Sequence, residues 1–162
     1  MIVVADASPL RYLVLIEAAD VLPALYDRVL TSPVVLQELS QPHTPEAVRK
    51  WATLHPDWLE LRIPSGSPVG FPSTLGAGER DAIALAEESH ADVLLVDDWA
   101  GRREAKRRLL PIQGTLGLLG VAAHHGFIDL PSAIARLRQT NFRAHEDLFR
   151  LILKREVQRG KS

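Results

Sequence analysis

Short apolar runs rich in Val, Leu and Ile constrain the fold of this chain more than any other feature. They lie at residues 2–5, 29–31, 59–63, 93–96 and, as the weakest of the five, 110–112. A strand with one wet face alternates apolar and polar residues, whereas a continuous apolar run is typical of a strand buried on both faces. The runs therefore predict a sheet that is covered by helices on both sides.

Helical patterns separate these runs. Three pairs place a good N-cap before a good first helical residue, at Ser8-Pro9, Ser32-Pro33 and Thr44-Pro45. Amphipathic spacing predicts a helix over residues 78–90. Thr115 is the expected N-cap of a helix over 116–125, and two further helices are expected, one from Leu130 and one over 146–158. Strands that alternate with helices predict an α/β fold, a three-layer α/β/α sandwich with a mainly parallel central sheet of four or five strands.

The length of 162 residues fits one domain, which we expect to span residues 1–158, followed by a frayed tail at 159–162. Residues 64–78 are rich in Pro, Gly and Ser and are interpreted as a loop within that domain. No apolar run approaches the roughly 20 residues of a membrane helix, and the N-terminus lacks the basic stretch of a signal peptide. The chain has no cysteine, which is compatible with a cytoplasmic protein and excludes thiolate metal sites.

Acidic residues recur where predicted strands end or where helices reach the same edge of the sheet: Asp6, Glu38, Glu79, Asp81, Asp97 and Asp98. In an open parallel sheet, ligands bind beyond the carboxyl ends of the strands. Carboxylates gathered there repel one another, and a divalent cation such as Mg²⁺ or Mn²⁺ removes that conflict because it prefers oxygen ligands. The acids therefore predict a metal site suited to phosphodiester hydrolysis.

Each acid taken alone has a plainer explanation. Asp6 could shape a strand-to-helix turn, Glu38 could be a solvated helix residue, and Glu79 or Asp81 could favour a helix N-terminus. Glu79 and Asp81 lie about 200° apart around a helix, so they should not face one point equally. Asp97 and Asp98 would point in opposite directions if the strand continued through them. We keep both members of each pair and rank Asp98 above Asp97.

A formal net charge of −1 leaves no overall basic surplus for binding a nucleic acid, so any surplus must be local. Residues 102–108 hold five basic residues and one Glu, and we expect Arg102, Arg103 and Lys106 to contact a phosphate backbone. Trp99 is a candidate for stacking on a base. A solvated helix face and packing at the sheet rim are the alternatives. The six histidines form no pair at metal-binding helix spacing.

Four motifs in order carry a family resemblance: Asp6-Ala7-Ser8-Pro9-Leu10, Val34-Val35-Leu36-Gln37-Glu38-Leu39, Gly76-Ala77-Gly78-Glu79-Arg80-Asp81, and Leu94-Leu95-Val96-Asp97-Asp98. The set resembles the PIN-domain nucleases, and more narrowly the prokaryotic branch akin to VapC toxins. The similarity runs from Met1 to about Leu153 and includes the segment that begins at Gly114. No single motif is highly specific, but the ordered set is much more so.

The resemblance implies a PIN-like fold and cleavage of single-stranded RNA that depends on Mg²⁺ or Mn²⁺. It assigns the acids to Asp6, Glu38, either Glu79 or Asp81, and either Asp97 or Asp98, with Ser8 as the small hydroxyl residue near the first acid. Asp6, Glu38, Asp97 and Asp98 are the expected metal ligands. The resemblance alone implies a toxin of a toxin–antitoxin pair, with a protein antitoxin as a partner and a homodimer as the oligomeric state.

Three other functions fit parts of the pattern. A haloacid dehalogenase type of phosphatase needs Asp-x-Asp after the first strand, but here Ser8 stands where the second acid belongs. A phospho-receiver needs a Lys after a late strand, and residues 110–114 contain none. A non-catalytic RNA-binding scaffold would tolerate loss of the acids.

Overall fold

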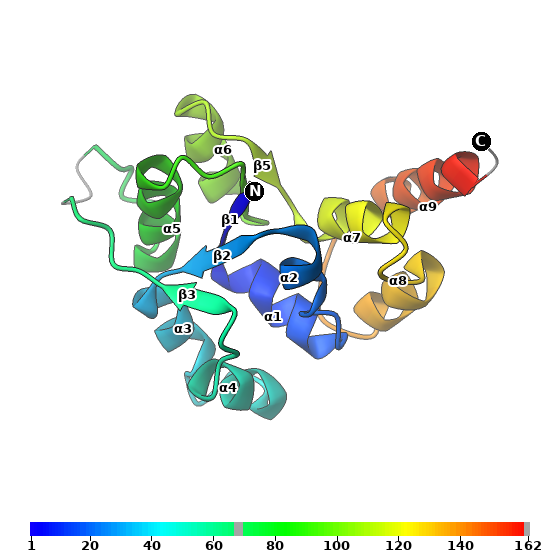
Figure 1. Ribbon diagram of the computed structural model, residues 1–162, viewed down its shortest axis with the longest axis horizontal. Coiled ribbons are helices and arrows are strands. Elements are labelled where there is room, and N and C mark those ends of the chain that lie inside the picture. Colours follow the sequence, from blue (N-terminus) through cyan, green and yellow to red (C-terminus); the bar gives the residue numbers. More distant parts are fainter. Residues whose placement is uncertain (67–69, 161–162) are drawn as a thin grey trace.

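One central sheet organises the molecule in this computed structural model, which describes residues 1–66 and 70–160. Within those residues the sheet has five strands, all parallel, in the order β3-β2-β1-β4-β5 (Figure 1). The strands are β1 (Ile2–Ala5), β2 (Arg28–Thr31), β3 (Leu59–Leu61), β4 (Val93–Leu95) and β5 (Ile112–Gln113). The predicted α/β class and parallel sheet are confirmed.

Helices connect the strands and continue beyond the last one. They are α1 (Ala7–Leu15), α2 (Val21–Leu25), α3 (Pro33–Leu39), α4 (Glu46–Thr53), α5 (Ala77–Glu88), α6 (Trp99–Arg107), α7 (Thr115–His124), α8 (Leu130–Arg138) and α9 (Glu146–Gly160). None of the helices in residues 1–66 and 70–160 has the length and apolar character needed to cross a membrane. Part of the predicted loop, residues 67–69, and the last two residues of the predicted tail lie outside the described residues.

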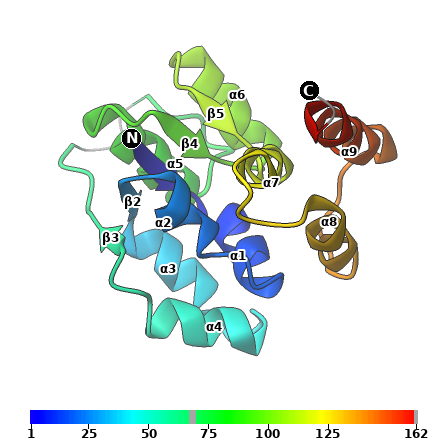
Figure 2. The ribbon, with the colours of Figure 1, turned by 45° about the vertical axis from the view of Figure 1, so that its right-hand side comes forward.

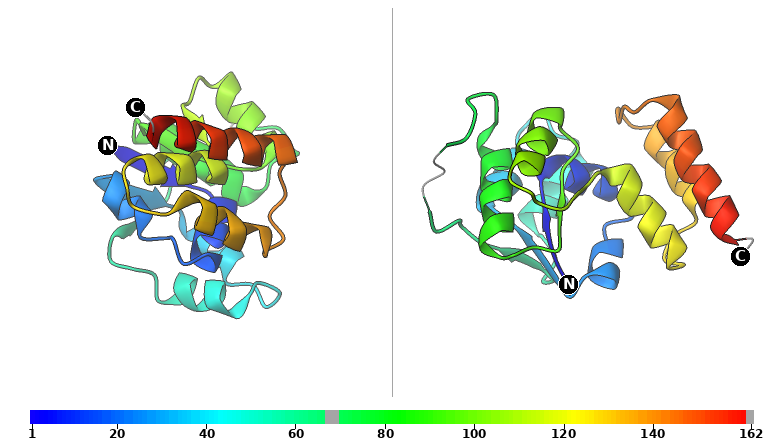
Figure 3. Two further views of the ribbon diagram at one scale, coloured as in Figure 1. Left: turned by 90° about the vertical axis from the view of Figure 1, so that its right-hand side faces the viewer. Right: turned by 90° about the horizontal axis from the view of Figure 1, so that it is seen from above.

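The two faces of the sheet bury different helices because successive strand residues point to opposite sides. Val4 and Leu94 pack with α5 and α6, while Val3, Ala5 and Leu95 pack with α1, α3 and α7. Seen from above, α5 and α9 lie on opposite sides of the sheet (Figure 3, right). This is the predicted three-layer sandwich.

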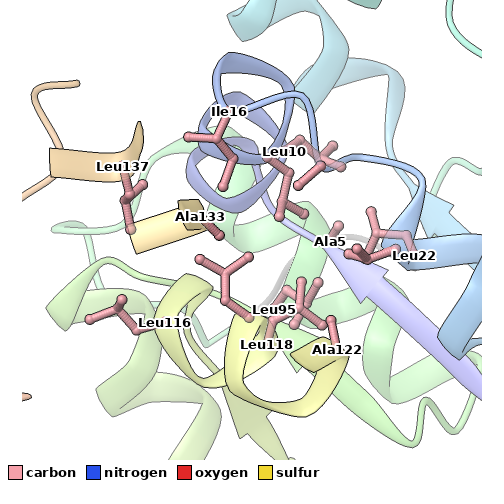
Figure 4. Packing of buried hydrophobic residues seen from close by; sticks show 14 of the residues in the cluster. Ala5, Leu10, Ile16, Leu22, Leu95, Leu116, Leu118, Ala122, Ala133 and Leu137 are labelled. Carbon is pink, nitrogen blue, oxygen red and sulfur yellow. The ribbon is translucent and has the colours of Figure 1, made fainter. Parts of the chain in front are cut away.

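The last three helices form an additional unit against one face of the sandwich (Figures 1 and 2). Leu118 and Ala122 of α7 meet Leu10 of α1, and Leu137 of α8 belongs to the same buried cluster (Figure 4). Helix α9 packs on both α7 and α8 and buries Phe149. The segment after β5 is therefore part of the core rather than a free extension.

Two helix starts differ from the expected ones in a way that matters for the site. Ser32 caps α3 as predicted, and its hydroxyl oxygen accepts from the Val35 amide at 3.2 Å. The N-cap of α1, however, is Asp6, so Ser8 lies within the first turn and its side chain is directed elsewhere. The N-cap of α7 is Gly114 rather than Thr115, which also frees the Thr115 hydroxyl for another contact.

Candidate metal-binding site

The ends of β1 and β4 place the first and last acids side by side. The two strands pair in parallel with Ala5 opposite Leu95, and the amide of Asp6 donates to the carbonyl of Leu95 at 3.0 Å. Asp6 thus leaves β1 at the point where β4 leads into Asp97 and Asp98. The predicted edge of the sheet is the place where these acids converge.

Asp6 is the least solvated acid of the group. It is 4% exposed, and its Oδ1 atom is buried and has no hydrogen-bond partner among the described residues. Burial, together with the nearby carboxylates of Glu79, Glu38 and Asp98, raises the pKa of Asp6 to about 7, against a lowering by the hydrogen bond from the Ala7 amide. Carboxylates from three other segments therefore help to raise the pKa of Asp6.

Glu38 and Glu79 reach this place from α3 and α5. The Glu38 Oε1 atom accepts from the Gly78 amide at 3.1 Å, and a Cβ atom at position 78 would collide with the Glu38 carboxylate. Burial raises the pKa of Glu38, as do Glu79 and, last, Asp81. Glu79 acts on both Asp6 and Glu38, whereas Asp81 acts only on Glu38, so of the two candidates Glu79 lies deeper in the cluster.

Asp97 and Asp98 diverge, and the reason is local. Asp98 is the N-cap of α6, where its Oδ2 atom accepts from the Gly101 amide at 3.0 Å, and it acts on Asp6. Asp97 instead binds Thr115, accepting from its amide at 2.7 Å and its hydroxyl at 2.6 Å, and it accepts from the Ser8 hydroxyl at 3.1 Å. Asp97 therefore joins α1, β4 and α7, while Asp98 belongs to the acid cluster.

The acid cluster, defined as Asp6, Glu38, Glu79 and Asp98, suits a hard cation. Its donors are all carboxylate oxygens, and Asp6 Oδ1 is buried with an unused lone pair. Yet residues 1–66 and 70–160 contain no group of three or more Asp, Glu, His or Cys side chains that is arranged to hold a metal ion. The expected ready-made nest is therefore not present as such. The Gly78 amide holds Glu38, and the Gly101 amide holds Asp98.

A comparison with known proteins identifies the family of this chain. A family model described as a PIN domain matches residues 2–158, almost the whole chain. The chain belongs to the PIN-domain family. No curated protein matches it. PIN domains are generally nucleases, and the match does not separate the VapC-like branch from the rest of the family.

The basic and aromatic candidates of this PIN domain lie along α6 and differ in their contacts and exposure. The guanidinium of Arg102 donates to the carbonyl of Val96 at 3.0 Å, at the end of β4. Arg103 and Lys106 are exposed. Trp99 is 70% exposed, and Arg103 lies 5.3 Å from its ring centre. The Trp99–Arg103 pair lines a hollow with Glu104 and Arg107, and none of the six candidate acids lines that hollow.

Another hollow includes Glu38 of the acid cluster, and the sequence did not predict it. It has a volume of about 390 Å³, includes Ser8 and Glu38, and is also lined by Arg11, Tyr12 and His43. Arg11 follows Ser8 by three residues on the same helix face, which is the only sequence signal that points to it. This hollow opens beside Glu38, between α1 and α3.

Proposed function

We propose that this PIN domain is an endoribonuclease that cleaves single-stranded RNA with the help of Mg²⁺ or Mn²⁺. The environment of Asp6 is the observation that carries the proposal. A buried carboxylate with an unpartnered oxygen, surrounded by three more acids, resists ionisation unless a cation joins it. Such a site costs stability, which favours a functional explanation over a structural one.

In this proposal some residues bind the cation and others position those ligands. Asp6, Glu38, Glu79 and Asp98 would hold the cation, and Gly78 and Gly101 orient two of them through backbone amides. Asp97 keeps the Ser8 hydroxyl beside the cluster and fixes the start of α7. A bound divalent cation supplies an activated water and offsets the charge on the phosphate.

The decisive experiment combines metal dependence with matched variants. Labelled RNAs of varied sequence are incubated with the pure protein in Mn²⁺, Mg²⁺ or EDTA. Asp6→Asn is expected to lower cleavage by at least about 10²-fold. Asp57→Asn is the control, because Asp57 is exposed and precedes β3 at the opposite edge of the sheet.

Each alternative outcome has a definite meaning. Cleavage that EDTA leaves intact, or that survives Asp6→Asn unchanged, contradicts the proposal. RNA that is bound but not cleaved in any metal indicates the non-catalytic scaffold. Hydrolysis of 4-nitrophenyl phosphate in place of RNA indicates the phosphatase.

We further propose a cytoplasmic toxin that pairs with a protein antitoxin and forms a homodimer. The resemblance to the VapC-like branch supports these three points. A small DNA-binding protein encoded next to this chain, which suppresses RNA cleavage when mixed with it, is the expected partner. Light scattering of the pure protein measures the oligomeric state, and a monomer at all concentrations contradicts the dimer.

A further inference from the structure

Charge is divided unevenly along this chain, although its net charge is only −1. Residues 1–98 hold 15 acidic and 6 basic side chains, whereas residues 99–162 hold 5 acidic and 13 basic ones. The basic surplus is thus much wider than the α6 run at residues 102–108. Because the acid cluster draws on residues up to 98, the acidic site and the basic helices are different parts of one molecule.

Two hollows adjoin each other along α9. The first, of about 480 Å³, is lined by Asp97, Gln113, Arg143, Leu148 and Ile152, among others. The second shares Gln113, Gly117 and Ile152 with it and adds the charged side chains of Arg155, Glu156 and Arg159. Together they form a groove between β5, α7 and α9, which we call the α9 groove. Figure 3 (left) shows α9 running beside α7 over this part of the molecule.

The groove includes Asp97, the residue that precedes Asp98 of the acid cluster. The carboxylate of Asp97 is already engaged by Thr115 and Ser8. From there the groove passes Arg143 and reaches Arg155 on α9. Both arginine side chains are exposed, and no ion pair engages either of them in the described part of the chain.

On the basis of the proposed function, we propose that the α9 groove binds the single-stranded RNA that extends from the cleavage site. Apolar side chains, including Leu148 and Ile152, offer surfaces for unstacked bases, while Arg143 and Arg155 meet the phosphates. A duplex keeps its bases stacked inside and would leave the apolar surface unused.

The position of the groove favours RNA over an acidic protein segment. An acidic peptide laid along it would bring its carboxylates up to Asp97 and Asp98, where like charges repel. An RNA strand has to pass this same point, because the scissile phosphate must reach the cation held by the acid cluster. Because the groove includes Asp97, the residue before Asp98, its position favours RNA as the occupant.

The test measures RNA binding without cleavage. In the Asp6→Asn background, fluorescence anisotropy follows a labelled RNA of about 15 nucleotides in EDTA between about 50 and 200 mM KCl. The groove pair is Arg143→Gln with Arg155→Gln. The control pair, Arg136→Gln with Lys154→Gln, removes two charges from the same basic segment at exposed positions that line neither hollow.

The groove pair is expected to raise the Kd by about tenfold and to reduce the salt slope by about 1.4, which corresponds to two lost phosphate contacts on a single strand. The control pair should change the Kd by less than about twofold. Equal losses in both pairs, or no loss in either, overturn the inference. Binding of poly-glutamate that depends on the groove pair, with unchanged RNA binding, assigns the groove to an acidic partner and also overturns it.

Cleavage by the otherwise wild-type protein separates this inference from the proposed function. For the long RNA, the groove pair should raise KM and leave kcat unchanged, while a substrate of about 4 nucleotides should be cleaved as by wild type. If wild type cleaves no RNA in any metal, the proposed function fails, but the anisotropy still reports on the groove. If wild type cleaves and the groove pair matches it on long RNA, only the groove inference fails.

Discussion

Two carboxylates that are equally buried, Asp6 at the sheet edge and Glu104 on α6, have opposite surroundings. Each is 4% exposed. Hydrogen bonds from Arg107, then those from Arg108, lower the pKa of Glu104 to about 2, against the effect of its desolvation. Asp6 faces other carboxylates, and burial raises its pKa to about 7. The carboxylate with arginine partners is thus a stable anion, and the desolvated carboxylate among other acids ionises reluctantly.

The difference shows where the fold leaves a charge uncompensated. Arginines are plentiful on α6, and at Glu104 they complete an ion-pair network that also reaches Glu87. In residues 1–66 and 70–160 no Lys or Arg forms an ion pair with a member of the acid cluster. A cluster that excludes the protein's own cations is available to a cation from solution.

The largest effect on stability is expected from removing the charge of Asp6. Because its pKa in the folded state is raised from 3.8 to about 7, its contribution to stability is complete below about pH 4 and is lost as the pH rises through 7. Without divalent cations, the advantage of Asp6→Asn over wild type should grow by up to about 4 kcal/mol between pH 4 and pH 8. Urea unfolding in EDTA measures it.

Asp57→Asn, at an exposed position, is the control and should follow the wild-type pH dependence. An advantage of Asp6→Asn that stays constant with pH would show that Asp6 ionises as easily in the folded chain as in the unfolded one. The contrast with Glu104 would then disappear.

Adding Mn²⁺ should narrow the stability gap between Asp6→Asn and wild type. At a free Mn²⁺ concentration of about 100 times its Kd, wild type should gain about 2.7 kcal/mol, while Asp6→Asn should gain much less. Since the pKa of Asp6 lies at about 7, binding at neutral pH should also release protons, and calorimetry in buffers of different ionisation enthalpy counts them. Equal gains for the two proteins would place the cation away from Asp6.

Much of this arrangement could be predicted because it depends on local pattern. The runs at β1 and β4 and the acids that follow them placed Asp6 and the Asp97 pair at one sheet edge. The choice between Asp97 and Asp98 could not be made, since it depends on Thr115, 18 residues along the chain from Asp97. Helix α2 was missed because it has only five residues, with Pro23 at its centre.

The α9 groove lay beyond the reach of sequence patterns for a different reason. Its walls come from β5, α7 and α9, and the packing of α9 against α7 brings Arg143 and Arg155 to the same groove. The choice between Glu79 and Asp81 depended in the same way on the exact start of α5. Ala77 begins that helix, which sets Glu79 in its first turn toward Asp6.

Glu104→Gln tests the other half of the comparison and should cost about 1–3 kcal/mol, because it weakens charged hydrogen bonds at a buried position. The pKa of Glu104 is lowered from 4.5 to about 2, so its stabilisation is complete above about pH 4.5 and is lost as the pH falls through 2. The gap between variant and wild type in urea unfolding should therefore shrink in acid. RNA cleavage should stay at the wild-type rate, and a large loss of cleavage would link α6 to the site.

Thr115→Val should have the smallest effect, about 1 kcal/mol in urea unfolding. Thr115 is fully buried, and its hydroxyl is one of three donors to Asp97, which keeps the Thr115 amide and the Ser8 hydroxyl after the change. Thr115→Ser retains the donor and is the control. If Thr115→Val instead raised stability at pH 8 in EDTA, as Asp6→Asn is expected to do, Asp97 would belong with the uncompensated acids. A modest cost that Thr115→Ser avoids identifies Asp97 as an acid whose charge the fold itself compensates, like Glu104, although by neutral donors rather than arginines.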